Sequence, residues 1–188
     1  MITANVKTEL IELLARHAYK AGAVSLSSGK QSDYYVDSKV VTYGPEGAIL
    51  VGTAVWDAIR DENVAGVGGL TLGADAIVVA TVIAAHYAGY DLPGFIVRKE
   101  PKKHGMKRMI EGVLPEPGSR IAIVDDVVTS GGSVFQSIDE AERDGLEVAI
   151  VVPLVDREEG AREKIESRGI KFTPICTARQ LRRIAIGR

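Results

Sequence analysis

The residues best suited to chemistry lie at positions 120–133, which read RIAIVDDVVTSGGS. Two adjacent carboxylates, Asp125 and Asp126, follow a short apolar run, and the segment TSGGS comes after them at 129–133. The glycines permit a tight turn whose backbone N–H groups and hydroxyls converge on one anion. Carboxylates do not hold phosphate without a bridging cation, so we expect the acid pair to bind sugar hydroxyls beside a phosphate in the turn. The pattern therefore indicates a site for a phosphorylated ribose.

The elements around this stretch would place the two groups side by side. The apolar run 121–124 is typical of a strand that is buried on both faces of a parallel sheet. After the turn, apolar residues recur at helical spacing before Gly145, so the turn opens a helix whose dipole favours phosphate. No P-loop and no GxGxxG dinucleotide turn is present in the sequence. The alternative is that the acid pair merely ends a strand and TSGGS is an ordinary turn.

The apolar run, the acid pair and TSGGS occur together in residues 121–133. With this spacing they resemble the phosphoribosyl-diphosphate (PRPP) signature of the type I phosphoribosyltransferases. The resemblance implies that Asp125 and Asp126 meet the 2- and 3-hydroxyls of the ribose. It also implies that the loop after them binds the 5-phosphate of PRPP through Val127, Val128, Thr129, Ser130, Gly131, Gly132 and Ser133.

A strongly basic segment follows the apolar residues 95–97. Residues 98–108 contain six Lys or Arg and one Glu, although the whole chain has a net charge of −2. The segment contains Pro101 and Gly105 and has no apolar periodicity, so it is expected to be a mobile loop at a local anion site; the alternative is a solvated charged face. It resembles the catalytic loop of the orotate phosphoribosyltransferases. The resemblance implies that PRPP is bound by Arg98, Lys99, Lys102, Lys103 and His104, and that Lys102 or His104 donates a proton during catalysis.

Residues 21–38 are rich in Ser, Gly and Tyr and include SSGKQSDYYVD. A polar hairpin is one interpretation. The segment also resembles the amino-terminal part of the orotate phosphoribosyltransferases that lines the pyrimidine pocket. The resemblance implies that orotate is bound by Ser28, Gly29, Tyr34, Tyr35 and, from the signature loop, Thr129. Many bacterial relatives have a Lys where this chain has Ser27, so one positive charge must come from elsewhere or be absent.

Arg157 follows a long apolar run at 146–155. It could form a surface ion pair with Glu158 or Glu159, which would contribute little stability. The resemblance instead implies that Arg157 binds the carboxylate of orotate, for which its guanidinium offers bidentate geometry.

The segment GGLTLGAD at 68–75 lies between a short strand at 65–70 and an apolar helix at 76–87. It could be a simple tight turn, or a turn whose backbone N–H groups approach an anion. The resemblance identifies it as the pyrophosphate loop, in which Leu70 and Thr71 bind PRPP and the Leu70–Thr71 peptide is the candidate for a cis bond. Gly73 stands where strongly bacterial versions have a Lys.

Composition is that of an ordinary globular protein, with 188 residues, 46% apolar and 26% charged. We expect one domain, 1–188, with an amino-terminal substrate-pocket segment at 1–40 and the mobile loop at 98–108. A single Cys176 excludes an internal disulfide, and no segment is typical of a secretion signal or long enough to span a bilayer, so a cytoplasmic protein is expected. The chain lacks the domain-wide basic excess of a nucleic-acid-binding protein.

Strand-like apolar runs alternate with segments of helical periodicity along the chain. This alternation predicts an α/β fold with a mostly parallel central sheet flanked by helices. A ligand crevice is expected at the carboxyl ends of the strands. Further helices are expected at 3–20, 45–60 and 179–188, and a last strand at 170–176.

The chain is identified as a member of the orotate phosphoribosyltransferase family. Membership implies that orotate and PRPP give orotidine 5'-monophosphate and pyrophosphate, with Mg2+ held mainly by PRPP and Asp125 as the candidate protein contact. It implies a homodimer in which the loop 98–108 reaches the partner's site, with no nucleic-acid or membrane partner. The alternatives are another type I phosphoribosyltransferase that acts on a purine base, or a PRPP-sensing regulator of the same fold.

Overall fold

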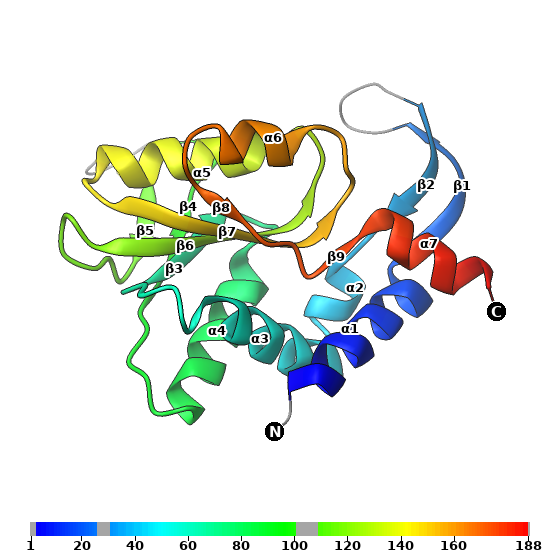
Figure 1. Cartoon of the computed structure of the whole chain (residues 1–188), viewed down its shortest axis with the longest axis horizontal. Helices are drawn as coiled ribbons and strands as arrows, with labels where there is room; N and C mark the ends of the chain where they lie inside the picture. The colour runs from blue at the N-terminus through cyan, green and yellow to red at the C-terminus, as the bar shows by residue number, and fades with distance from the viewer. Residues whose placement is uncertain (1–2, 26–30, 101–108, 188) are drawn as a thin grey trace.

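The protein was analysed as a computed structural model, which describes residues 3–25, 31–100 and 109–187. Its centre is a twisted seven-stranded sheet in the order β5-β4-β3-β6-β7-β8, with β9 also paired to β7 (Figure 1). All pairings in this sheet are parallel except that of β5 with β4. The strands are β3 Val67–Leu70, β4 Gly94–Val97, β5 Ile110–Gly112, β6 Arg120–Val128, β7 Glu147–Asp156, β8 Lys171–Phe172 and β9 Cys176–Thr177.

Helices cover both faces of the sheet (Figure 1). Helices α5 (Gly132–Arg143) and α6 (Ala161–Glu166) lie on one face, and α3 (Pro45–Ile59), α4 (Asp75–Tyr87) and α1 (Thr3–His17) lie on the other. The residues of β6 alternate between the two cores: Ile121 and Ile123 pack on the α5 side, and Ala122 and Val124 on the α3 side. This double burial explains why the strand is a continuous apolar run, and it confirms the predicted α/β fold.

A small antiparallel hairpin stands beside the sheet. It consists of β1 (Tyr19–Ser25) and β2 (Gln31–Val36), with Ala21 opposite Tyr34, and the short helix α2 (Lys39–Thr42) follows it. The carboxyl-terminal helix α7 (Ala178–Ile186) lies close to α1 and β1 (Figure 1). The hairpin interpretation of residues 21–38 was therefore correct for the described part of this segment.

Several predicted boundaries were wrong for identifiable reasons. Strand β6 continues through Val128, because its pairing with β7 extends to Val128 opposite Asp156, so the acid pair lies inside the strand and not after it. The strand expected at 170–176 is divided into β8 and β9, because Pro174 lies between them and has no N–H to donate to a sheet. The first helix ends at His17, before the hairpin begins at Tyr19.

Within the described residues, no helix combines the length and the apolar character that crossing a bilayer requires.

Candidate active site

The polar residues singled out by sequence lie mostly at the carboxyl edge of the parallel strands. Strand β6 brings the acid pair and the turn 129–133 to this edge, β3 brings the loop 71–74, and β7 brings Arg157. The amide of Arg157 donates a hydrogen bond to the Val128 carbonyl at 2.9 Å, which fixes the end of β7 beside the signature strand. The edge is therefore one continuous site, as expected of an α/β sheet.

The two carboxylates are held differently. Asp125 is buried, with 5% of its surface exposed, and its Oδ1 accepts a hydrogen bond from the Asp126 amide at 3.0 Å. Asp126 Oδ1 accepts from the Val127 amide at 2.9 Å. Asp126 Oδ2 accepts from Ser38 Oγ at 3.0 Å and from Lys39 Nζ at 2.5 Å. The amino-terminal segment thus reaches the acid pair directly.

This arrangement shifts the pKa of Asp125 and that of Lys39. Burial, together with the negative charge of Asp126, raises the pKa of the Asp125 carboxyl to about 8. Burial alone would lower the pKa of Lys39, but its hydrogen bond to Asp126 and the charge of that carboxylate outweigh burial and raise it. Lys39 therefore stays cationic and the site holds a charged Lys39–Asp126 pair beside a carboxyl that tends to keep its proton.

The turn 129–133 has the form expected of an anion site. Gly131 has a φ of +91°, which favours glycine, and it caps α5 without a side-chain hydrogen bond. The side chains of Ser130 and Ser133 are exposed, and a Cβ on Gly132 would meet no atom within 4 Å. The first turn of α5 therefore presents N–H groups and hydroxyls to solvent, where a phosphate would find both donors and the helix dipole.

The loop after β3 packs against the acid pair. A Cβ on Gly73 would lie 2.7 Å from Asp125 Oδ1 and 2.7 Å from Asp126 Oδ1, so the backbone approaches the carboxylates where a side chain does not fit without a shift. Thr71 Oγ1 donates to Asp75 Oδ2 at 2.9 Å, inside the loop. The cis peptide lies at Thr71–Leu72 and not at Leu70–Thr71. Leu70 pairs with Val97 and the Thr71 amide donates to the Val97 carbonyl, so the strand ends at Leu70, as predicted.

Arg157 and Tyr34 form a second cluster at the same edge. The Arg157 guanidinium carbon lies 4.4 Å from the centroid of the Tyr34 ring, its Nη2 donates to Ser32 Oγ at 3.0 Å, and its Nε donates to Glu159 Oε1 at 2.9 Å. The ion pair with Glu159 that was the alternative for Arg157 is present, but the Arg157 side chain is 5% exposed, so this is no surface pair. Tyr35 points the other way from Tyr34, as strand alternation requires, and is exposed.

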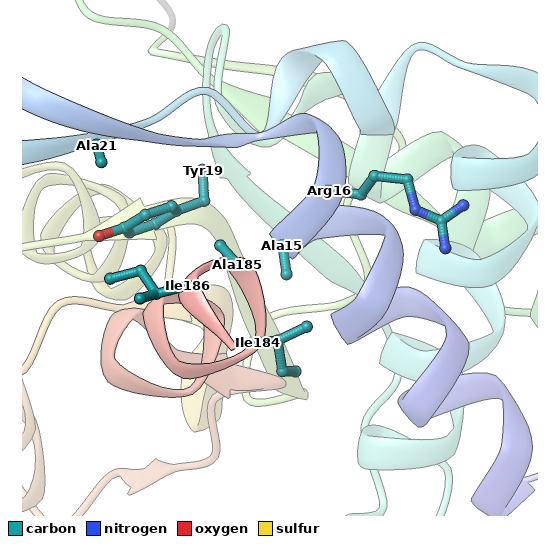
Figure 2. Close-up of a pocket in the computed structure, with 7 residues that line it drawn as sticks. All are labelled: Ala15, Arg16, Tyr19, Ala21, Ile184, Ala185 and Ile186. Atoms are coloured by element: carbon teal, nitrogen blue, oxygen red, sulfur yellow. The ribbon is translucent and has the colours of Figure 1, made fainter. Parts of the chain in front are cut away.

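The side chain of Tyr34 packs on a second aromatic ring, which lies beside α7. Its ring stacks on that of Tyr19, with centroids 5.6 Å apart. Figure 2 shows the Tyr19 ring beside Ile186, the last residue of α7. Both residues line a hollow of about 320 Å³. Helix α7 also pairs Arg182 with Asp33 of the hairpin and Arg179 with Glu158, each at 2.8–2.9 Å. Burial raises the pKa of the Tyr34 hydroxyl and the charge of Arg157 opposes this rise. The hairpin and the end of β7 are thus joined by α7.

Arg98 and Lys99, the first residues of the basic loop, are hydrogen-bonded to two neighbouring segments. The Arg98 amide donates to the Met109 carbonyl at 2.7 Å, and Gln136 Nε2 of α5 donates to the carbonyls of Arg98 and Lys99 at 3.3 and 3.1 Å. Arg98 and Lys99 line a hollow of about 440 Å³ together with Thr71, beside the pyrophosphate loop. Five predicted site residues lie outside the described residues: Ser28, Gly29, Lys102, Lys103 and His104.

Sequence reasoning missed Ser38, Lys39 and Gln136. Ser38 and Lys39 directly follow the YYVD motif, and the absence of lysines at positions 27 and 73 was a signal that another cation was needed. Nothing in the sequence marks Gln136, because its role depends on the packing of α5 against the strand that precedes the basic loop.

No protein-family model matches the chain. Among curated proteins, the orotate phosphoribosyltransferase of Aquifex aeolicus is 45% identical over 167 residues, covering 87% of this chain and 91% of the relative. That of Synechocystis sp. is 40% identical and covers 96% and 91%. Among solved structures, Mycobacterium tuberculosis orotate phosphoribosyltransferase in complex with PRPP is 33% identical, with a TM-score of 0.78 and coverage of 94% and 98%. Adenine phosphoribosyltransferase from Leishmania donovani, at 17% identity and a TM-score of 0.65, shares the fold. The identities and coverage of these relatives show that the chain belongs to the orotate phosphoribosyltransferase family.

Proposed function

We propose that this protein transfers the 5-phosphoribosyl group of PRPP to orotate, giving orotidine 5'-monophosphate and pyrophosphate in de novo pyrimidine biosynthesis in the cytoplasm. Family membership supports the reaction. The structural observation that supports it most is the Arg157–Tyr34 cluster, which lies at the same sheet edge as the acid pair and the phosphate turn. A flat anionic base and a phosphorylated sugar would therefore meet at one edge.

The base site fits a carboxylated ring. Arg157 is buried and its Nε and one Nη are held by Glu159 and Ser32, so its guanidinium is fixed in orientation before a ligand arrives. The remaining N–H groups could bind the orotate carboxylate, and charge-assisted bonds of this kind are the strong ones. Tyr34 offers a ring for stacking. Uracil lacks the carboxylate, and a purine offers none either, so both should be poor substrates.

The transfer breaks the bond between ribose C1 and the diphosphate oxygen and forms a bond between C1 and a nitrogen of orotate. The diphosphate leaves with the bonding electron pair, and the proton on the attacking nitrogen is lost. Positive charge develops on the sugar while negative charge grows on the leaving group, so the site must stabilise both. Asp126, which is held by Ser38 and Lys39, would hold ribose hydroxyls near the developing cation, and the turn 129–133 would bind the 5-phosphate.

The basic loop would act on the leaving group. Arg98 and Lys99 border the hollow beside Thr71, so cationic side chains stand next to the pyrophosphate loop. We propose that Lys102, Lys103 and His104 extend this cluster over the diphosphate, with Lys102 or His104 as the proton donor. Closure of the loop would also exclude water, which otherwise hydrolyses PRPP.

A magnesium ion fits this site only as a partner of the substrate. Asp125 is buried and one of its oxygens is already hydrogen-bonded, and among the described residues no three His, Cys, Asp or Glu side chains gather as a metal site. We therefore propose that PRPP oxygens supply most ligands, with Asp125 as the candidate contact from the protein. The bound ion would neutralise charge on the diphosphate.

We also propose that the enzyme is a homodimer whose basic loop serves the partner's site. Support comes from an exposed apolar surface on α3 and α4, where Ile49, Ile83 and Tyr87 are 71%, 50% and 87% exposed around a hollow of about 620 Å³. Apolar patches of this kind are typical of protein interfaces. Loop exchange is tested by mixing a nearly inactive Lys102→Ala dimer with a nearly inactive Asp126→Asn dimer. Each mixed dimer should regain one complete site; verified subunit exchange without recovered activity would refute the shared loop.

The proposed reaction is tested by following the loss of orotate absorbance with PRPP and Mg2+. We expect turnover by the wild type, none without PRPP, and a strongly reduced rate for Asp126→Asn. Wild-type protein that binds PRPP but leaves orotate unchanged would show that the proposed function is wrong and would favour a PRPP-sensing regulator.

A further inference from the structure

Two neighbouring residues of the amino-terminal segment converge on a single oxygen of the acid pair. Ser38 Oγ and Lys39 Nζ both donate to Asp126 Oδ2, at 3.0 and 2.5 Å, across more than 80 positions of sequence. The other oxygen, Oδ1, accepts from the Val127 amide. Three donors therefore fix the Asp126 carboxylate, and two of them come from outside its own strand.

The Ser38 hydroxyl binds Asp126 and does not make the capping hydrogen bond that is usual for a serine at the start of a helix. Ser38 occupies the N-cap of α2, where serine normally accepts a bond from the helix backbone, but its side chain makes no cap hydrogen bond. The side chain of Asp37 accepts from the Lys39 amide instead, at 3.3 Å. Ser38 is fully buried, so its hydroxyl has no solvent alternative. The local structure of 37–39 therefore directs both donors at Asp126.

The opposite side of the acid pair cannot supply a cation without rearrangement. A Cβ at Gly73 would lie 2.7 Å from an oxygen of each carboxylate, so a longer side chain there would have to displace them. The negative charge of the Asp126 carboxylate repels the polyanionic PRPP. Lys39 is the described cation that balances this charge by direct contact, and its side chain is 43% exposed, so it borders open space beside Asp126.

We propose that Lys39, assisted by Ser38, is a positioning residue for phosphoribosyl transfer. It holds Asp126 in the orientation that receives the ribose hydroxyls, and it offsets the negative charge of Asp126 so that PRPP can approach. Since Ser38 and Lys39 lie two and three residues after the strand that contains Tyr34, a single short segment then links the base pocket to the sugar site. This inference rests on the proposed function and names a residue that the sequence motifs did not include.

The test compares Lys39→Met, Lys39→Arg and Ser38→Ala with the wild type, with PRPP and orotate varied separately. Lys39→Met should lower kcat/KM for PRPP by about 10- to 100-fold, because both a charge and an orienting contact are lost, and should change KM for orotate by less than about twofold. Lys39→Arg should recover most of the loss, since it restores a cation. Ser38→Ala should have a smaller effect in the same direction.

Lys171→Met is the matched control, because Lys171 is also a half-exposed lysine that pairs with a carboxylate, Glu62, away from the site. It should leave both kinetic constants unchanged. The proposal is overturned if Lys39→Met keeps kcat/KM for PRPP within about twofold of the wild type. It is also overturned if the Met and Arg variants lose activity and thermal stability equally, since Lys39 would then be merely structural.

Failure of the proposed function would be recognised separately. If the wild type does not convert orotate, calorimetric titration with PRPP still decides the role of Lys39. The Met variant should bind PRPP about 10-fold more weakly than the wild type, because one positive charge beside the polyanion is missing. Equal affinities would contradict the proposal.

Discussion

Replacement of Asp125 by Asn should stabilise the ligand-free protein. Burial and the charge of Asp126 raise the pKa of Asp125 from 3.8 to about 8. Because the folded pKa lies above the unfolded value, the folded state binds the extra proton between these pH values, and the free energy of unfolding falls as the pH rises through this window. Burial of the Asp125 charge above pH 8 should therefore cost a few kcal/mol, and about 3 kcal/mol is expected because the site can relax and admit water.

The assay is urea unfolding of the ligand-free wild type and Asp125→Asn at pH 5 and pH 8.5. The Asn amide can still accept from the Asp126 amide but has no charge to bury. The variant should be more stable by about 3 kcal/mol at pH 8.5 and by clearly less at pH 5. Asp61→Asn is the control, because the Asp61 side chain is 88% exposed and its replacement should change little. Equal stabilities of wild type and Asp125→Asn at pH 8.5 would show that burial of the Asp125 charge does not destabilise the folded protein.

Three further changes test the roles assigned at the sheet edge and on the surface. Asp126→Asn should keep the fold and lower turnover on the order of 100-fold, measured by steady-state kinetics, because a charge that stabilises the transition state is lost; unchanged turnover would contradict this role. Arg157→Ala should raise KM for orotate far more than KM for PRPP, since only orotate has the carboxylate; equal increases would make Arg157 structural. Ile83→Asp should shift a dimer to monomers in light scattering, whereas Val113→Asp, a comparably exposed apolar site elsewhere, should not; a dimer that survives Ile83→Asp would place the interface elsewhere.

The fold was predictable because the pattern of apolar residues in each strand or helix reflects which of its faces are buried. The run at 121–124 is apolar throughout since its residues face two cores in turn, and the glycines at 131 and 132 mark the start of α5. The acid pair and Arg157 were found because charged residues next to buried strands are unusual. What could not be predicted depends on contacts between distant segments: Lys39 with Asp126, Gln136 with the root of the basic loop, and α7 behind Tyr19. These contacts follow from how helices dock on the sheet, which local sequence patterns do not encode.

The position of a turn or strand end was also beyond the sequence. Strand β6 runs through two aspartates against their low strand propensity, because its partner β7 continues beside it to Asp156. The cis peptide lies at Thr71–Leu72, one residue later than predicted.

Transfer of the phosphoribosyl group to orotate is best tested by a competition between bases in one reaction mixture. Wild-type protein is given PRPP and Mg2+ with equal concentrations of orotate, uracil and adenine, and the nucleotide products and pyrophosphate are quantified by mass spectrometry and phosphorus NMR. We expect orotidine 5'-monophosphate as the main nucleotide, in a one-to-one ratio with pyrophosphate. A preference for adenine or uracil, or consumption of PRPP without any nucleotide product, would contradict it.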